Sequence, residues 1–102
     1  MAAVSLDHVL ALAAVLFAVG FVGLLTRRNL IVVLACIEIM LNAANINLVA
    51  FSSYFGDATG QGFALFSFGI AAAEVTIGLA ILLNLNKLRK TVDVDDINLL
   101  RW

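Results

Sequence analysis

Three apolar segments alternate with short polar segments along the chain. Residues 9–26 carry no charged side chain, residues 30–51 carry only Glu38, and residues 63–85 carry only Glu74. At a rise of about 1.5 Å per residue, each segment forms a helix of roughly 27 to 35 Å, enough to cross the hydrocarbon core of a bilayer. The pattern predicts an all-α membrane protein with three transmembrane helices.

The polar positions between these segments set the expected boundaries. We expect helices at about residues 4–26, 30–51 and 61–86, and a tail at residues 87–102. The first connection is Arg27-Arg28-Asn29, and the second runs from Ser52 to about Gly62. Both are short enough for tight hairpins between antiparallel helices. Residues 1–102 therefore form a single three-helix domain.

The composition is typical of a membrane protein. Hydrophobic residues make up 64% of the 102 residues and charged residues 13%, and the mean hydropathy is +1.11. Three spans use most of this length, so no soluble catalytic domain with its own core fits beside them. A net charge of −1 supplies no basic surface for nucleic acid. The lipid bilayer is the expected surroundings.

The basic residues predict an orientation. In a three-span arrangement all six fall on one side of the membrane: Arg27, Arg28, Lys87, Arg89, Lys90 and Arg101. Basic residues in short loops concentrate on the cytoplasmic side. We therefore expect the N-terminus outside and the C-terminus in the cytoplasm.

Glu38 and Glu74 are the candidate functional residues, because a charged group near the bilayer centre is costly and marks a functional site by default. From their helix lengths, Glu38 lies about 12 Å and Glu74 about 16 Å from the inner membrane surface. The two depths differ by only about one helical turn. If the second and third helices pack together, one or two water molecules could join the carboxyl groups.

Neighbouring polar and small residues support this interpretation. Glu38, Asn42 and Asn45 follow an i, i+4, i+7 spacing and form one polar stripe that can organise water. On the third helix, Glu74 shares a face with the small residues Ala71 and Gly78, which would let another helix approach closely. We expect Glu74 to face protein rather than lipid.

The chemistry of paired buried carboxyl groups favours proton transfer. Burial of a carboxyl group favours its neutral form, and a second carboxyl group nearby couples the two titrations. The alternative is a permanently protonated carboxyl group that only tethers two helices. The sequence shows no nucleotide site, redox centre or metal-ligand cluster, and its lone His8 is expected at the membrane interface. Energy for proton movement must come from other chains.

Motifs along nearly the whole chain resemble a known family. They are the arginine hairpin Leu25-Thr26-Arg27-Arg28-Asn29-Leu30, the segment Ile37-Glu38-Ile39-Met40-Leu41-Asn42-Ala43-Ala44-Asn45, and the segment Ala71-Ala72-Ala73-Glu74-Val75-Thr76-Ile77-Gly78. Together with the length and the three-helix layout, they resemble the K subunit of respiratory complex I, the counterpart of the mitochondrial 4L subunit.

The resemblance implies a non-redox subunit in the membrane arm of a proton-pumping oxidoreductase that takes electrons from NADH or a related donor to quinone. It places Glu38 and Glu74 in a line of buried charged residues that links the quinone end of the arm to antiporter-like subunits, with Arg27 and Arg28 in the cytoplasmic loop. The chain itself would bind no cofactor or metal. NADH, FMN, iron–sulfur clusters and quinone would belong to partner subunits, in an energy-coupling membrane such as a bacterial plasma membrane.

Other classes of small membrane protein fit less well. A small multidrug transporter would have four spans with an acidic residue in the first, and a rotary ATPase ring subunit would have two helices with a glycine repeat. A small subunit of a related cation/proton antiporter complex is the closest alternative, although we would expect it to lack the glutamate pair.

Overall fold

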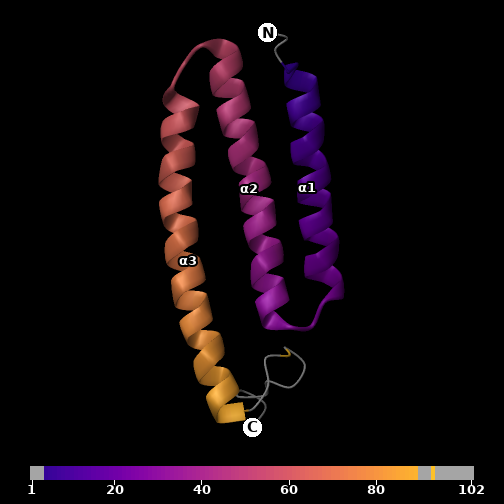
Figure 1. The fold of residues 1–102 in the computed structure, drawn as a ribbon, viewed down its shortest axis with the longest axis vertical. Helices are drawn as coiled ribbons and strands as arrows, with labels where there is room; N and C mark the ends of the chain where they lie inside the picture. Colours follow the sequence, from indigo (N-terminus) through magenta and orange to yellow (C-terminus); the bar gives the residue numbers. More distant parts are fainter. Residues whose placement is uncertain (1–3, 90–92, 94–102) are drawn as a thin grey trace.

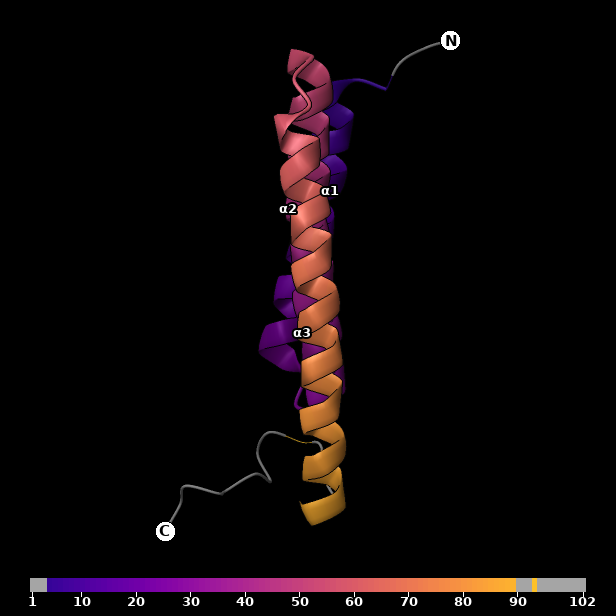
Figure 2. The same ribbon diagram turned by 90° about the vertical axis from the view of Figure 1, so that its left-hand side faces the viewer.

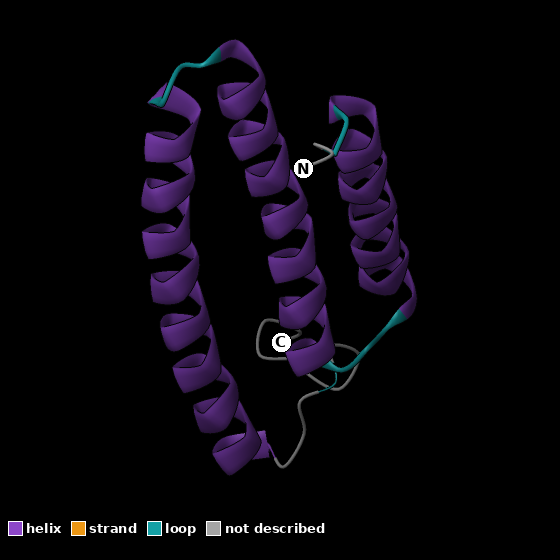
Figure 3. Ribbon diagram, turned by 45° about the horizontal axis from the view of Figure 1, so that its top comes forward, coloured by secondary structure: helices purple, strands orange, loops and turns teal. Residues whose placement is uncertain are grey.

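The computed structural model describes residues 4–89 and 93. It contains three helices, α1 (Leu6–Thr26), α2 (Leu30–Phe55) and α3 (Thr59–Arg89). Successive helices run in opposite directions, and α2 lies between α1 and α3 (Figure 1). Seen from the side, the helices overlap in a narrow strip, so they form a single layer (Figure 2). Short loops make the two connections (Figure 3).

Side-chain caps define where the helices begin. Ser5 accepts a hydrogen bond from the backbone N–H of His8 at the start of α1. Asn29 accepts hydrogen bonds from the N–H groups of Ile31 and Val32 at the start of α2, at 2.9 and 3.4 Å. These bonds satisfy backbone donors that have no partner within the first helical turn. Asn29 therefore has a structural role in the arginine hairpin.

The connection between α2 and α3 is shorter than the sequence predicted. α2 continues to Phe55, beyond the expected end at residue 51, and α3 already begins at Thr59. Gly56 ends α2 in the left-handed conformation, with φ of 68°, which glycine adopts without steric cost. Asp57 then accepts hydrogen bonds from the N–H and hydroxyl groups of Thr59, and these bonds lower the pKa of Asp57 below its ordinary value of 3.8.

The other ends also differ from expectation by a few residues. α1 starts at Leu6 rather than near residue 4, and α3 extends three residues past the expected end at residue 86. Most of the predicted tail lies outside the described residues, but Asp93 forms a single antiparallel backbone pairing with Asn29. Asp93 therefore lies beside the loop that carries the arginines.

Small residues set the contacts between α1 and α2. A Cβ atom added to Gly20 would lie 2.8 Å from the carbonyl oxygen of Cys36 and 2.7 Å from Cγ of Met40. A Cβ atom added to Gly23 would lie 2.5 Å from Sγ of Cys36. Small residues such as Gly20, Gly23, Ala14 and Ala18 are a sequence signal for close packing of membrane helices, and the two glycines make such contacts. Ala14 and Ala18 are exposed, and Ala13 is the buried alanine of α1.

Few side chains are buried within this single layer. Among the described residues, the buried apolar ones are Ala13, Cys36, Ala43, Ala64 and Leu82, and none of the large side chains is fully buried. Phe66 and Leu83 are 70% and 68% exposed. All three helices are long and apolar enough to cross a membrane. Lipid and neighbouring protein must cover the exposed apolar surface, because water does not solvate it favourably.

Candidate functional site

The contact between α2 and α3 sets the relative level of the two glutamates. A Cβ atom added to Gly78 would lie 3.3 Å from a methyl carbon of Leu34. Gly78 follows Glu74 by four residues, and Leu34 precedes Glu38 by four residues. Because α2 and α3 run antiparallel (Figure 1), equal offsets from this contact place Glu38 and Glu74 at the same level along the layer.

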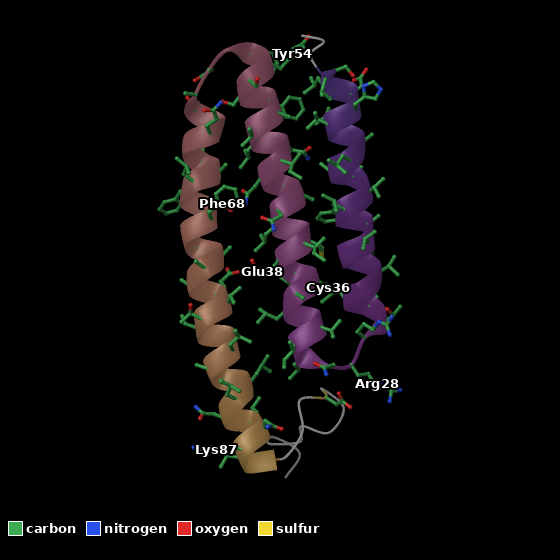
Figure 4. All side chains as sticks on the ribbon, in the orientation of Figure 1. Arg28, Cys36, Glu38, Tyr54, Phe68 and Lys87 are labelled. Carbon is green, nitrogen blue, oxygen red and sulfur yellow. The ribbon has the colours of Figure 1, made fainter. Side chains whose placement is uncertain are left out.

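Glu38 lies on the side of α2 that faces α3 (Figure 4). Its side chain is half-buried, and its Oε1 atom is inaccessible to solvent. This oxygen has no hydrogen-bond partner among residues 4–89 and 93. A buried carboxyl oxygen without a partner is costly, and an internal water molecule is the group that usually satisfies such an atom.

Glu74 lies at the edge of the α3 surface that contacts α2. Gly60 and Gly78 both face α2 and are separated by about five helical turns, so they define a contact line along α3. At about 100° per residue, Glu74 lies about 40° to one side of this line, whereas Phe68 lies about 80° to the other. Gly78 lets α2 approach closely, as expected. The Glu74 side chain is nevertheless not covered by α1 or α2 and is exposed.

Two residues of the polar stripe on α2 line a groove. Asn42 and Asn45 both contribute to its lining, but Asn42 is exposed whereas Asn45 is 97% buried, with 3% of its surface accessible. The groove has a volume of about 530 Å³ and lies between the start of α1, the second half of α2 and Phe68 of α3. Its remaining lining is mostly apolar: Val4, Leu6, Val9, Ile46, Val49, Ala50, Ser53 and Tyr54.

Asn47 lies on the opposite side of α2 from this groove. At about 100° per residue, Asn47 lies roughly half a turn away from the stripe of Glu38, Asn42 and Asn45. Its Oδ1 atom is buried and has no hydrogen-bond partner in the described part of the chain. The sequence shows only that Asn47 is a polar residue inside an apolar span. It does not show which neighbouring helix buries the Asn47 side chain.

The arginine hairpin lies at the end of the layer away from Tyr54 (Figure 4). Arg27 and Arg28 are exposed, and the backbone N–H of Arg27 donates to the carbonyl of Gly23 at 3.0 Å. Along α2, Glu38 is about 15 Å from Arg28. At this separation the arginines can act on the carboxyl group through the electrostatic field but not by direct contact.

A second polar group lies at the opposite end of the layer, at the start of α1. His8 Nδ1 lies 2.7 Å from Ser5 Oγ. No group of three or more histidine, cysteine, aspartate or glutamate side chains that could hold a metal ion occurs in the described residues. The buried polar atoms of α2 thus remain the feature that calls for a functional explanation.

Comparison with known proteins decides the family. Residues 8–102 match the family of NADH-ubiquinone/plastoquinone oxidoreductase chain 4L. NADH-quinone oxidoreductase subunit K of Ruegeria pomeroyi is 54% identical over 99 residues, covering 96% of this chain and 98% of that protein. The chain belongs to this family. Subunit K of Bacillus cereus is 52% identical over 103 residues, covering 99% of both chains, and subunit K 2 of Geotalea uraniireducens is 46% identical over 98 residues, covering 96% and 98%.

Family membership confirms the resemblance that the arginine hairpin and the two glutamate motifs indicated. The relatives are subunits of NADH-quinone oxidoreductase, so a member of the 4L family is one subunit of a multisubunit oxidoreductase complex. With three helices able to span a membrane, this member is an integral membrane protein. Its exposed apolar surface is therefore shared between lipid and the other subunits of the complex.

Proposed function

We propose that this chain is a membrane-arm subunit of a proton-pumping NADH:quinone oxidoreductase and relays protons through Glu38 and Glu74. The observation that carries the proposal is the Leu34–Gly78 contact, which puts both glutamates at one level of the layer. Matched depth favours a relay because it shortens the path between the two carboxyl groups, which hydrogen-bonded water can then bridge.

The state of each carboxyl group supports this role. Glu38 has a buried oxygen without a hydrogen-bond partner among the described residues, and Glu74 is exposed on the edge of α3. Neither would remain in a membrane without a polar neighbour, because hydrocarbon offers no hydrogen bonds. Water between α2 and α3 would link Glu38 to Glu74, and polar groups of an adjacent subunit would continue the path from Glu74.

The energy for this transfer comes from the partner subunits in this proposal. They would bind NADH, FMN, iron–sulfur clusters and quinone, and quinone reduction would change the field or the hydration around the glutamates. The partners include the subunits at the quinone end of the membrane arm and the antiporter-like subunits. The exchange of each glutamate for glutamine, measured in the assembled complex, tests the relay.

The proposed orientation has the N-terminus outside and the arginine hairpin in the cytoplasm of a bacterium. In a Cys36→Ala background, Ala58→Cys should react with a membrane-impermeant thiol reagent in intact cells, whereas Lys87→Cys should react only after the membrane is opened. Both positions are exposed, and they lie at opposite ends of α3, Ala58 just before its start and Lys87 near its end. If Lys87→Cys reacts in intact cells and Ala58→Cys does not, the chain has the opposite orientation.

Removal of both arginines from the hairpin should lower turnover without loss of assembly. At about 15 Å and an effective dielectric constant of about 20, each charge changes the energy of an ionised Glu38 by about 1 kcal/mol. Loss of both charges changes this energy by about 2 kcal/mol, so we expect Arg27→Ala with Arg28→Ala to reduce quinone reductase activity roughly thirtyfold. Lysine at both positions should retain most of the activity. Wild-type activity in an assembled double alanine variant would leave the arginines a topological role only.

A further inference from the structure

Ser52 is one of two polar side chains that are buried in the described part of the chain, and its hydroxyl group bonds across a loop. This group donates to the carbonyl oxygen of Asp57, five residues further along. The hydroxyl groups of Thr26 and Thr76 instead donate to carbonyls four residues earlier in their own helices, as is common for such residues. The backbone N–H of Asp57 also donates to the carbonyl of Ser52 at 3.0 Å. Ser52 therefore binds the loop to the end of α2 through two hydrogen bonds.

Asp57 binds the same loop to α3. Its Oδ1 atom accepts hydrogen bonds from the backbone N–H of Thr59 at 2.9 Å and from the Thr59 hydroxyl group at 2.7 Å. Residues 56–58 alone connect the two helices. With bonds at both ends, this connection opposes a slide of α3 along α2, because a slide of one turn, about 5.4 Å, exceeds the length of a hydrogen bond.

The first turn of α3 packs directly on Ser52. A Cβ atom added to Gly60 would lie 2.9 Å from Cβ of Ser52 and 2.5 Å from the carbonyl oxygen of Leu48. At Gly78, near the other end of the contact, the nearest atom would be 3.3 Å away. The two helices therefore approach most closely beside the hydrogen-bonded loop.

The rest of the α3 contact surface defines the register of the two helices only weakly. Among residues 59–88, those that are not exposed recur every three or four positions, and the four nearest the loop are Gly60, Ala64, Ser67 and Ala71. A slide of one turn would exchange the alanines and the serine among themselves, and such small changes of volume cost little. Gly78 contacts only the flexible end of Leu34. The strongest constraint on register is thus at the loop.

We propose that Ser52 and Asp57 are positioning residues, which fix α3 along α2 and so hold Glu38 and Glu74 at one level. A slide of one turn would move Glu74 by about 5.4 Å relative to Glu38, and a water bridge would then need a further molecule. The effect on turnover rests on the proposed relay, whereas the fixed register does not. Ser52 and Asp57 themselves carry no proton in this proposal.

Disulfide formation between α2 and α3 in membranes measures the register. In the Cys36→Ala background, Leu34→Cys with Gly78→Cys reports the register of the structure, because a Cβ atom at position 78 lies 4.0 Å from Cγ of Leu34. Leu34→Cys with Val75→Cys or with Leu82→Cys reports a slide of about one turn in either direction. With a membrane-permeant oxidant, the 34–78 disulfide should form in highest yield.

The two positioning residues are then changed in each cysteine pair. Ser52→Ala should lower the yield of the 34–78 disulfide relative to the other two roughly fivefold, because a buried hydrogen bond is lost. Asp57→Ala, at an exposed position, should shift this ratio in the same direction, and it decides the question if Ser52→Ala is absent from the membrane. Ser53→Ala is the matched control, since it removes an exposed hydroxyl group one residue away. An unchanged ratio in Ser52→Ala, or an equal change in Ser53→Ala, would overturn the proposal.

Turnover of the assembled complex tests the consequence for the reaction. With the 34–78 cysteine pair reduced, Ser52→Ala should lower quinone reductase activity per assembled complex roughly threefold. Oxidation to the 34–78 disulfide should restore this activity, because it imposes the register again, and should not raise the activity of Ser53→Ala. A shifted disulfide ratio with unchanged turnover would refute the positioning role. If glutamine at Glu38 and Glu74 leaves wild-type rates, the relay fails while the disulfide ratio still tests the register.

Discussion

Glu74→Gln is expected to reduce coupled quinone reduction and proton uptake on the order of 100-fold, while the complex still assembles. Glutamine keeps the size and hydrogen-bonding capacity of the side chain but cannot take up and release a proton. In a tightly coupled enzyme, blocked proton transfer also slows electron flow. The measurement is quinone reductase rate and proton uptake in vesicles, each normalised to the assembled complex.

Glu38→Gln serves as the comparison within the same chain. We expect a smaller loss, because Asn42 and Asn45 remain on the same stripe of α2 and can still organise water near this position. Glu74→Asp retains a carboxyl group and should recover part of the activity. Wild-type rates in assembled Glu74→Gln would exclude the relay, and loss of the complex in every Glu74 variant would favour a structural tether.

Gly20→Ala is expected to destabilise the packing of α1 on α2 by about 1–3 kcal/mol. The added Cβ atom would lie 2.8 Å from the Cys36 carbonyl oxygen and 2.7 Å from Cγ of Met40. The backbone oxygen cannot move without a shift of α2. We expect less chain in the membrane and a lower midpoint temperature for loss of quinone reductase activity.

Gly78→Ala is the matched control for this substitution. Its added Cβ atom would lie 3.3 Å from one methyl group of Leu34 and 3.4 Å from the other. These atoms are at the flexible end of a side chain and can give way. Alanine also favours a helix over glycine by about 1 kcal/mol. We expect a change near zero, and equal effects of Gly20→Ala and Gly78→Ala would show that backbone contact does not limit this packing.

The ends of the helices illustrate how far local sequence signals reach. Asn29 follows the arginines, and both the expected and the observed start of α2 lie at Leu30. At the other hairpin, the polar residues from Ser52 onward suggested an early end, yet α2 continues to Phe55. The decisive signals were Gly56 and Asp57, which end one helix and cap the next. Such signals are local. A glycine with a positive φ ends a helix through its backbone conformation, whereas polar side chains alone do not end one.

The sequence by itself determined the three membrane-spanning segments, the family, and the two glutamates as candidate residues. These follow from apolar length, rare charges and motif spacing, because a membrane helix satisfies its backbone hydrogen bonds within one segment. No information from distant residues is needed for them.

Only the tertiary structure decided how the helix faces meet. It placed Glu74 at the edge of the α3 contact surface and gave Asn45 and Asn42 different burial within one stripe. It also set both glutamates at one level through Leu34 and Gly78. In a membrane, lipid-facing and protein-facing surfaces are both apolar, so periodicity does not distinguish them. The close approach of small residues selects the faces, and that depends on how the helices pack together.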